Sequence, residues 1–352
     1  MAKSTVGGLE PAVSVVIPCR NEESAIRTCL DSLIVQAEPP GGFEVLVVDG
    51  MSDDGTREIV SRYVSLVPKV KMIDNPKRTT PAALNIGIRV ARGEVVVRAD
   101  VHTEYASDYV KCCLEVLRGT LADNVGGPAR TTTTGLRQAA IAAGYHSWFS
   151  VGGARFHKAG YEGPVDTVTY GCWPKETFER FGFFDEELVR NQDDEHNIRI
   201  VRGGGLVWQS PRIRSWYRPR SGLPDLFRQY FQYGYWKVRV IRKHHLPGSW
   251  RHLVPGLFVV SLLVLLLAST FSKTARWLMA AELMTYLCCN MMASYLAART
   301  QRRWGLMPIL LGVFPTFHIS YGMGFLLGVV DFIVLRRSPR EFAGKLTRPS
   351  SH

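Results

Sequence analysis

An ionisable pair, Asp100 and His102, stands shortly after the apolar run formed by residues 95–97. The run is typical of a buried strand, and residues two positions apart on an extended segment point to the same side. A carboxylate and an imidazole at one point can hold a divalent cation that keeps coordination positions for phosphate oxygens. The alternative explanation is a solvated strand end with a local ion pair to Arg98.

Acidic residues mark two further candidate sites. Asp49 ends an apolar run and could accept hydrogen bonds from a base or a ribose. Asp193 and Asp194 belong to an acidic cluster before a helical pattern, where a carboxylate could take the proton of an acceptor hydroxyl. The alternative for this cluster is a helix N-terminus enriched in acids. The sequence contains neither GxGxxG nor GxxxxGK[ST], so neither a dinucleotide cofactor nor P-loop chemistry is indicated.

Strands and helices alternate in the first hundred residues. The expected strands are continuous apolar runs, which predicts right-handed βαβ units and a parallel sheet covered on both faces. Ligands of such sheets bind beyond the carboxyl ends of the strands, where Asp49 and Asp100 lie. We expect strands at 12–18, 43–50, 70–74, 93–100 and 207–211. We expect helices at 21–36, 52–64, 79–91, 106–118, 135–150, 174–181 and 192–202.

Charge is unevenly distributed along the chain, whose net charge is +12. Residues 202–252 hold eleven Lys or Arg and one acid, Asp225, directly before apolar stretches. This arrangement favours the anionic face of a membrane over nucleic acid as a partner. The seven cysteines form no CxxC pair and no zinc spacing, which indicates free thiols in a reducing compartment. The N-terminus has no apolar signal region, so no cleaved secretory peptide is expected.

Two apolar stretches, residues 253–271 and 275–298, are predicted to span a membrane because each is long enough to cross its hydrocarbon core. Glu282 lies in the second stretch and should face another helix or the membrane surface, since an acid is costly at mid-membrane. Basic residues on both sides of residues 306–335 favour an even number of crossings. We therefore expect a short hairpin or re-entrant pair broken near Pro315. One long tilted helix is the alternative, and it would place the basic tail outside.

These patterns divide the chain into four parts: an α/β domain, a basic aromatic interfacial segment, an apolar region with two spans and the hairpin, and a basic tail. They comprise residues 1–225, 226–252, 253–335 and 336–352. The Lys and Arg residues beside the spans place the α/β domain and the tail of this multi-pass protein in the cytoplasm.

Four sequence features occur in an order and spacing that resembles the family 2 glycosyltransferases of the GT-A fold. They are VSVVIPCRNEE, VVDGMSDDGT, the Asp100–His102 pair and NQDDEHNIRI. Within this family the chain most resembles the membrane-bound succinoglycan-type exopolysaccharide glucosyltransferases, which share an Asp-x-His metal motif and an FxYGYWK-like segment. The resemblance covers residues 12–245. It implies a Rossmann-like GT-A domain with a mostly parallel sheet, followed by C-terminal transmembrane helices.

The resemblance also implies roles for single residues. Asp100 and His102 would stand where the family commonly has Asp-x-Asp, and they would bind Mg²⁺ or Mn²⁺ together with the donor diphosphate. The cation would neutralise the departing diphosphate. The nucleotide-sugar pocket would be lined by Pro18, Arg20, Glu22, Asp49 and Asp100, with Asp49 near the uracil.

Asp193 would match the Asp of the family's Glu-Asp pair and act as the catalytic base. Gln192 stands where the family has Glu, so Asp194 remains an alternative base. The implied reaction is a single in-line displacement. The acceptor hydroxyl loses its proton and attacks the anomeric carbon, UDP departs, and the configuration inverts.

Residues 227–245 are basic and aromatic, which favours a position among lipid headgroups. Gln232 and Trp236 lie four positions apart on an expected helix and could line the entrance for the acceptor. A plain membrane anchor is the alternative. Processive members of the family carry Gln-x-x-Arg-Trp, whereas this chain has Tyr235 at the Arg position, which argues against processive polymer synthesis.

The resemblance implies a plasma-membrane enzyme that moves a hexose, with glucose the expected sugar, from a UDP-sugar donor to a hydroxyl of a lipid-linked saccharide. The product would enter exopolysaccharide or cell-surface glycan synthesis. Two alternatives stay open: a polyprenyl-phosphate glycosyl synthase, and a non-catalytic membrane protein that binds nucleotide sugars. Acids at three sequence-distant sites disfavour the second alternative, because a binding protein needs no base.

Overall fold

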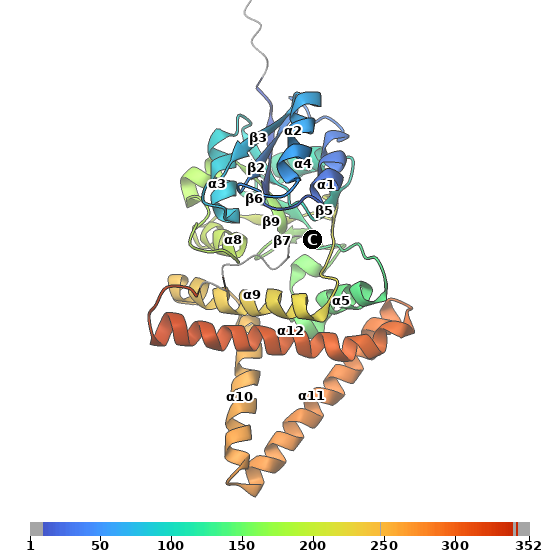
Figure 1. The fold of residues 1–352 in the computed structure, drawn as a ribbon, viewed down its shortest axis with the longest axis vertical. Helices are drawn as coiled ribbons and strands as arrows, with labels where there is room; N and C mark the ends of the chain where they lie inside the picture. Colours follow the sequence, from blue (N-terminus) through green and yellow to red (C-terminus); the bar gives the residue numbers. More distant parts are fainter. Residues whose placement is uncertain (1–9, 247, 341–342, 344–352) are drawn as a thin grey trace, which may run out of the picture. The chain divides into compact units, whose positions relative to one another are not determined.

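The computed structural model describes residues 10–246, 248–340 and 343, which form two compact units (Figure 1). Among these residues, unit 1 comprises 10–130 and 155–217, and unit 2 comprises 131–154 and those from 218 onward. The segment 131–154, which was expected inside the 1–225 domain, therefore belongs to unit 2.

The described part of unit 1 is built on a mostly parallel eight-stranded sheet, as predicted. Strands β1 to β4 run parallel, β8 is antiparallel to its neighbours β4 and β6, and β9 is parallel to β6. The spatial order is β3-β2-β1-β4-β8-β6-β9-β7. The strands are β1 (Val13–Cys19), β2 (Phe43–Asp49), β3 (Val70–Asp74), β4 (Val95–Arg98), β6 (Asn124–Gly127), β7 (Gly163–Pro164), β8 (Thr169–Pro174) and β9 (Val207–Gln209).

Helices cover both faces of this sheet, because alternate residues of a strand point to opposite sides. Val15 and Ile17 of β1 belong to the apolar cluster formed with α1 and α4, whereas Val16 belongs to the cluster formed with α3 and α8. The helices of unit 1 are α1 (Ile26–Ile34), α2 (Thr56–Leu66), α3 (Thr80–Val90), α4 (Tyr109–Thr120), α7 (Glu176–Phe181) and α8 (Gln192–Arg202), and Arg155–His157 form a 3-10 turn.

A second, two-stranded sheet lies beside the end of β4. Its strands β5 (Thr103–Tyr105) and β10 (Ser215–Tyr217) are antiparallel, with Glu104 opposite Trp216. Because β5 begins one residue after His102, this small sheet holds the segment that leaves β4.

Unit 2 is helical. Its helices α9 and α12 lie side by side, while α10 and α11 are joined by a short turn (Figure 1). The elements are α5 (Leu136–His146), α6 (Trp148–Val151), α9 (Leu223–His244), α10 (Val254–Ser269), α11 (Lys273–Thr300) and α12 (Met307–Gly328), with 3-10 turns at Trp250–His252 and Trp304–Leu306 and a π-helical turn at Val329–Val334.

Glycines bring the backbones of α9 and α12 into close contact. A Cβ atom added at Gly324 would lie 2.0 Å from the carbonyl oxygen of Phe231, and one at Gly234 would lie 2.1 Å from that of Tyr321. Small residues allow this close approach of two helices. α12 is therefore packed along α9.

The predicted break near Pro315 is wrong, because α12 continues through this residue. A proline inside a helix has no N–H for the carbonyl four residues earlier, here that of Leu311. The Nδ2 atom of Asn290 on α11 donates a hydrogen bond of 3.0 Å to this oxygen. The acceptor that proline leaves open is thus satisfied from a neighbouring helix, and the chain has no need to turn there.

The acid in α11 faces another helix, as expected. The Oε1 atom of Glu282 accepts a hydrogen bond of 2.5 Å from the hydroxyl of Ser261 on α10. Two described helical stretches, Trp250–Ser269 and Trp304–Val334, are long and apolar enough to cross a membrane. α11, which contains the predicted span 275–298, is not one of them.

Candidate active site

Asp49 lies at the carboxyl end of β2, where its side chain is buried. Its Oδ2 atom accepts from the backbone N–H of Ser52 at 3.0 Å, and its Oδ1 atom from the Ser52 hydroxyl at 2.5 Å. Arg57 forms an ion pair of 2.5 Å with Oδ2. These contacts hold the loop after β2, while the predicted contact of Asp49 with uracil stays a prediction.

The loop after β1 lies against the loop after β2. Pro18 pairs with Val48 in the parallel register, and the backbone N–H of Glu22 donates to the Thr56 hydroxyl at 2.7 Å. A Cβ atom added at Gly50 would lie 3.1 Å from Cβ of Arg20, so the Arg20 side chain packs on that glycine. The structure therefore brings the four predicted pocket residues Pro18, Arg20, Glu22 and Asp49 to one edge of the sheet.

Arg98 ends β4, and its side chain is only 8% exposed. Its Nε and Nη2 atoms donate to the two carboxylate oxygens of Asp100 at 2.8 and 3.0 Å. The ion pair given above as an alternative is present, but its cation is buried and not solvated. Asp100 itself is 33% exposed, so it can contact a ligand while it is bound to Arg98.

The phenol of Tyr105 fixes the backbone of Asp100. The backbone N–H of Asp100 donates to the Tyr105 hydroxyl at 2.6 Å, and this hydroxyl donates to the carbonyl oxygen of Asp100 at 3.2 Å. Burial raises the pKa of Tyr105 well above its usual value, so the phenol keeps the proton that it donates. Tyr105 was not predicted as a site residue, although it stands five positions after Asp100.

His102 reaches across to the loop after β1. Its Nε2 atom lies 3.0 and 2.9 Å from the two carboxylate oxygens of Glu22. Carboxylate and imidazole groups suit Mn²⁺, so the chemistry of Asp100 and His102 fits the predicted cation. The described residues contain no group of three or more His, Cys, Asp or Glu placed to hold a metal ion. Oxygens of the nucleotide-sugar diphosphate would therefore have to complete the coordination of the cation.

Asp193 comes into the site from the first turn of α8. This helix begins at Gln192, after Asn191 in the left-handed region with φ 61°. The Oδ2 atom of Asp193 lies 3.6 Å from Nη1 of Arg98, and its side chain is 39% exposed. Its Oδ1 atom accepts from the backbone N–H of Asp194 at 2.9 Å. Asp193 is thus joined to Asp100 through one guanidinium.

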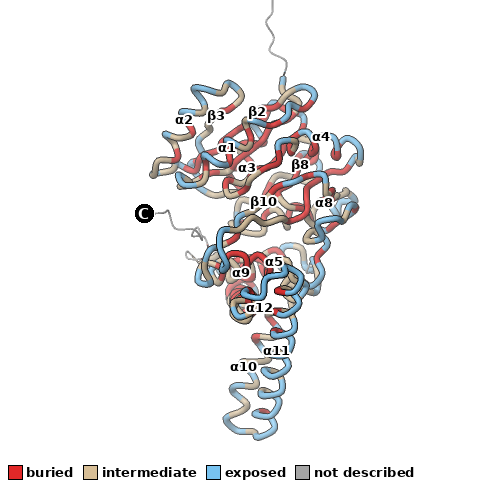
Figure 2. Tube along the Cα trace, turned by 90° about the vertical axis from the view of Figure 1, so that its right-hand side faces the viewer, coloured by how far each residue is buried: buried red, intermediate tan, exposed pale blue. Residues whose placement is uncertain are grey.

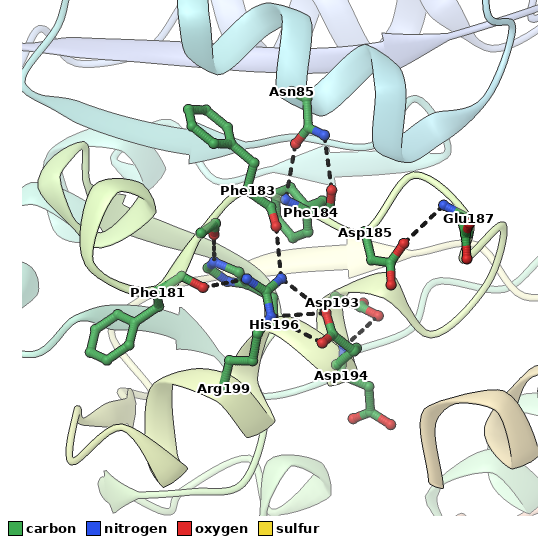
Figure 3. A network of polar contacts seen from close by, with 12 residues as sticks. Asn85, Phe181, Phe183, Phe184, Asp185, Glu187, Asp193, Asp194, His196 and Arg199 are labelled. Atoms are coloured by element: carbon green, nitrogen blue, oxygen red, sulfur yellow. Dashed lines mark hydrogen bonds and ion pairs between the residues drawn. The ribbon is translucent and has the colours of Figure 1, made fainter. Parts of the chain in front are cut away.

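Glu195, the third acid of this cluster, is fully buried and has a structural role. It forms an ion pair of 2.9 Å with Arg199, which also donates to the carbonyl oxygens of Phe181 and Phe183 (Figure 3). The amide of Asn85 on α3 binds the backbone of Phe184 (Figure 3). The loop 181–184 is therefore attached to both α3 and α8. The sequence signal for this network was the i,i+4 spacing of the Glu and Arg.

Comparison with protein families now identifies the chain. A model described as Glycosyl transferase family 2 matches residues 14–173. The succinoglycan biosynthesis protein ExoA of Rhizobium meliloti is 32% identical over 244 residues, which cover 68% of this chain and 73% of that protein. The chain belongs to glycosyl transferase family 2. A Methanococcus voltae relative, dolichyl N-acetyl-alpha-D-glucosaminyl phosphate 3-beta-D-2,3-diacetamido-2,3-dideoxy-beta-D-glucuronosyltransferase, is 28% identical over 263 residues, covering 72% of this chain and 81% of its own length.

Solved structures of this glycosyltransferase fold confirm the predicted GT-A architecture. The mannosyltransferase PcManGT of Pyrobaculum calidifontis, solved with GDP-Man and Mn²⁺, has a TM-score of 0.59 at 20% identity, covering 90% of this chain and 87% of its own. S. aureus TarS 1–349 in complex with UDP-GlcNAc has a TM-score of 0.50 at 15% identity, covering 89% and 90%. At these identities the likeness concerns the fold alone.

The two predicted acceptor residues lie in unit 2. Gln232 and Trp236 are one turn apart on α9, and both side chains are buried. The indole Nε1 of Trp236 donates to the carbonyl oxygen of Ala343 at 2.9 Å. This contact attaches Ala343 of the basic tail to α9, and the acceptor role of both residues stays a prediction.

Proposed function

We propose that this family 2 glycosyltransferase moves a hexose, with glucose the expected sugar, from a UDP-sugar to a hydroxyl of a lipid-linked saccharide. The product would serve exopolysaccharide or cell-surface glycan synthesis. The observation that carries the proposal is the arrangement of Asp100, Arg98 and Asp193. Through Arg98, it places the half-exposed carboxylate of Asp193 beside Asp100, which is expected to bind the donor diphosphate.

Asp193 takes the proton of the acceptor hydroxyl in this reaction. The acceptor oxygen forms a bond to the anomeric carbon from the face opposite the diphosphate, while the bond from that carbon to the diphosphate oxygen breaks. UDP leaves with the bonding electrons, the proton stays on Asp193, and the configuration inverts. Asp100 and His102 would hold Mg²⁺ or Mn²⁺, which when bound neutralises charge on the leaving diphosphate.

The names of related proteins support the substrate classes. PcManGT and TarS were solved with GDP-Man and UDP-GlcNAc, respectively, which are both nucleotide sugars. The Rhizobium meliloti relative is a succinoglycan biosynthesis protein, and the Methanococcus voltae relative is named for a dolichyl-linked sugar substrate. Uridine as the base and glucose as the sugar rest on the resemblance of the sequence.

Membrane anchoring is proposed from the exposed apolar surface of unit 2. α10 and α11 are largely exposed, whereas α9 and α12 cover much of each other (Figure 2). Trp250–Ser269 has 20 residues, about 30 Å of helix, which matches a hydrocarbon core. Exposed Trp250 and Trp304 flank the α10–α11 hairpin at its two outer ends, as is typical of a membrane interface.

The packing of α12 along α9 decides which helices we place in the bilayer. α9 carries Arg242 and Lys243 in its last turn and is too polar to cross, and α12 is packed along it. We therefore place α9 and α12 at the membrane surface and α10 and α11 as the two crossings. This placement retains the even number of crossings inferred from the sequence. It keeps the catalytic unit and the tail on the cytoplasmic side of the plasma membrane.

The proposal is tested by UDP release from UDP-glucose in membranes that contain the full chain, with a lipid extract as acceptor. Release should need Mn²⁺ or Mg²⁺ and lipid, and should fall about 10²–10⁴-fold to a residual rate in Asp193→Asn, while Asp194→Asn serves as the matched control. Activity retained in Asp193→Asn and lost in Asp194→Asn would move the base to Asp194. Activity retained in both variants would favour a lipid phosphate as acceptor, because a phosphate needs no base. UDP binding without release, with every nucleotide sugar and acceptor tried, would favour a non-catalytic protein.

A further inference from the structure

The guanidinium of Arg98 is a buried cation of the site. The carboxylates of Asp100 and Asp193, which pair with it, are partly exposed. Two of its nitrogens bind Asp100, and the third, Nη1, is buried without a hydrogen-bond partner and lies 3.6 Å from Asp193. One buried cation therefore pairs with two half-exposed anions from different parts of the chain, the segment after β4 and the first turn of α8.

Stability alone does not account for an arginine at this position. The three residues before it in β4 are buried valines, and an apolar side chain could continue that pattern. Replacing buried ion pairs with apolar residues is often neutral or stabilising, since each buried charge has a desolvation cost. A role of the two carboxylates in the reaction better explains why a buried arginine holds them in one place.

The shape of the guanidinium suits this work. Its Nε–Nη2 edge binds both oxygens of Asp100, which leaves Nη1 directed to Asp193. Each carboxylate oxygen has two lone pairs, so Asp100 can bind Arg98 and the donor side at the same time. A lysine ammonium is a single point charge and cannot reproduce a planar fork that holds two groups at a fixed spacing.

We propose that Arg98 is a positioning residue of the transfer reaction, which sets the spacing between the donor-binding carboxylate of Asp100 and the base Asp193. The proposal rests on the proposed function, because that function assigns the base to Asp193. Since Arg98 acts through these two carboxylates, its loss should impair the chemical step more than donor binding.

The test uses the full chain in membranes for kinetics and in detergent for binding. We expect Arg98→Met to lower kcat about 100-fold, the size of effect that misplaced reacting groups produce. UDP affinity in the presence of Mn²⁺, measured by calorimetry, should fall far less than kcat. Arg98→Lys should recover part of kcat. Arg130→Lys is the matched control, because the Arg130 side chain donates to the carbonyl oxygens of Ile213 and Pro211, and its kcat should stay within about twofold of wild type.

A double-mutant comparison separates this proposal from the proposed function. Once Asp193 is replaced by Asn, adding Arg98→Met should cause little further loss, because the two residues act as one unit. An inactive Asp193→Asn beside a fully active Arg98→Met would overturn the role of Arg98 and leave the function intact. An active Asp193→Asn would overturn the role of Arg98, and Asp194→Asn would then decide whether the proposed function retains a base at Asp194. Equal losses of UDP affinity and kcat in both Arg98 variants would show that Arg98 serves donor binding and not the spacing of the two carboxylates. If Arg98→Met fails to fold, the same comparison is made with Arg98→Lys alone.

Discussion

The Nε2 atom of His102 lies 2.9 Å from a carboxylate oxygen of Glu22, although the two residues are 80 positions apart. The contact joins the loop after β1 to the segment between β4 and β5. Both residues were assigned to the donor site from sequence, Glu22 to the nucleotide pocket and His102 to the cation. Their contact indicates that Glu22 orients the imidazole.

Glu22→Gln should therefore weaken cation binding without removing a predicted ligand. Carboxylates that orient a metal-binding histidine typically contribute about 10–100-fold to metal affinity. We expect at least about a tenfold loss of Mn²⁺ affinity in the presence of UDP, by calorimetry, and a larger loss in His102→Ala. Glu23→Gln, in the exposed neighbouring residue, serves as the control. Unchanged Mn²⁺ affinity in His102→Ala would remove His102 from the cation site.

The ion pair between Glu195 and Arg199 should stabilise unit 1. Glu195 is fully buried, and Arg199→Leu removes the cation that pairs with its carboxylate and the donor to two carbonyl oxygens. Loss of one partner of a buried pair costs about 3–5 kcal/mol. We expect that decrease in the free energy of unfolding, followed by urea denaturation of the full chain in detergent. The exposed Arg202→Leu on the same helix should change it by less than about 0.5 kcal/mol.

His196 predicts a dependence of stability on pH. Burial, and secondarily the nearby Arg199, lower the pKa of His196 from 6.5 to about 4. Its Nε2 atom donates to the carbonyl oxygen of Gly182 at 3.0 Å, and Nδ1 has no partner, which fits a neutral imidazole (Figure 3). In the unfolded chain this group takes up a proton at a higher pH than in the folded chain. The contribution of the neutral His196 imidazole to the free energy of unfolding is therefore complete above pH 6.5 and is lost as the pH falls toward 4.

The size of this effect is limited by the pKa difference. The free energy of unfolding should fall by up to about 1.4 kcal/mol per pH unit within that window. His196→Gln keeps a donor for Gly182 and cannot be protonated, so its stability should depend less on pH. Identical pH profiles of wild type and variant, measured by thermal unfolding from pH 4.5 to about 7.5, would show that His196 does not carry the effect.

The sheet was predictable in part, because its central strands are local apolar runs. β1, β2, β3 and β4 lie where the apolar segments predicted them. The antiparallel position of β8 between β4 and β6 was not predicted, since it depends on contacts between strands far apart in sequence. β9 lies within the predicted segment 207–211, whereas β6 and β7 have four and two residues, too few for a periodic signal.

The acids of the site were predictable from their places at strand ends and at a helix start. Their partners were not, because Arg98–Asp193 and Glu22–His102 each join segments that only the folded sheet brings together. The hairpin predicted at Pro315 failed for the same reason. Whether a proline breaks a helix depends on a donor such as Asn290, which belongs to another helix.

Asn290 should therefore stabilise the packing of α11 on α12. Asn290→Leu removes the donor to the Leu311 carbonyl, which proline leaves without its usual partner. Polar contacts between helices in membrane proteins contribute about 0.6–2 kcal/mol, and we expect a loss of that size in detergent unfolding. Pro315→Ala restores an N–H for this oxygen, so adding it to Asn290→Leu should recover stability. Further loss in the double variant would contradict this account.

The α10–α11 hairpin predicts which residues can be labelled from outside the cell. Phe271, 88% exposed, lies in the turn between the two helices, and Gln301 follows the far end of α11. With α10 and α11 as the two crossings, a cysteine at 271 should react with a membrane-impermeant maleimide on intact cells. A cysteine at 301 should react only after lysis. Cys288 and Cys289 are the exposed native thiols of the described chain, so both are first replaced by Ser. Labelling of both positions on intact cells would mean an even number of crossings between them, so α11 would not cross and the placement of α10 and α11 as the two crossings would be overturned.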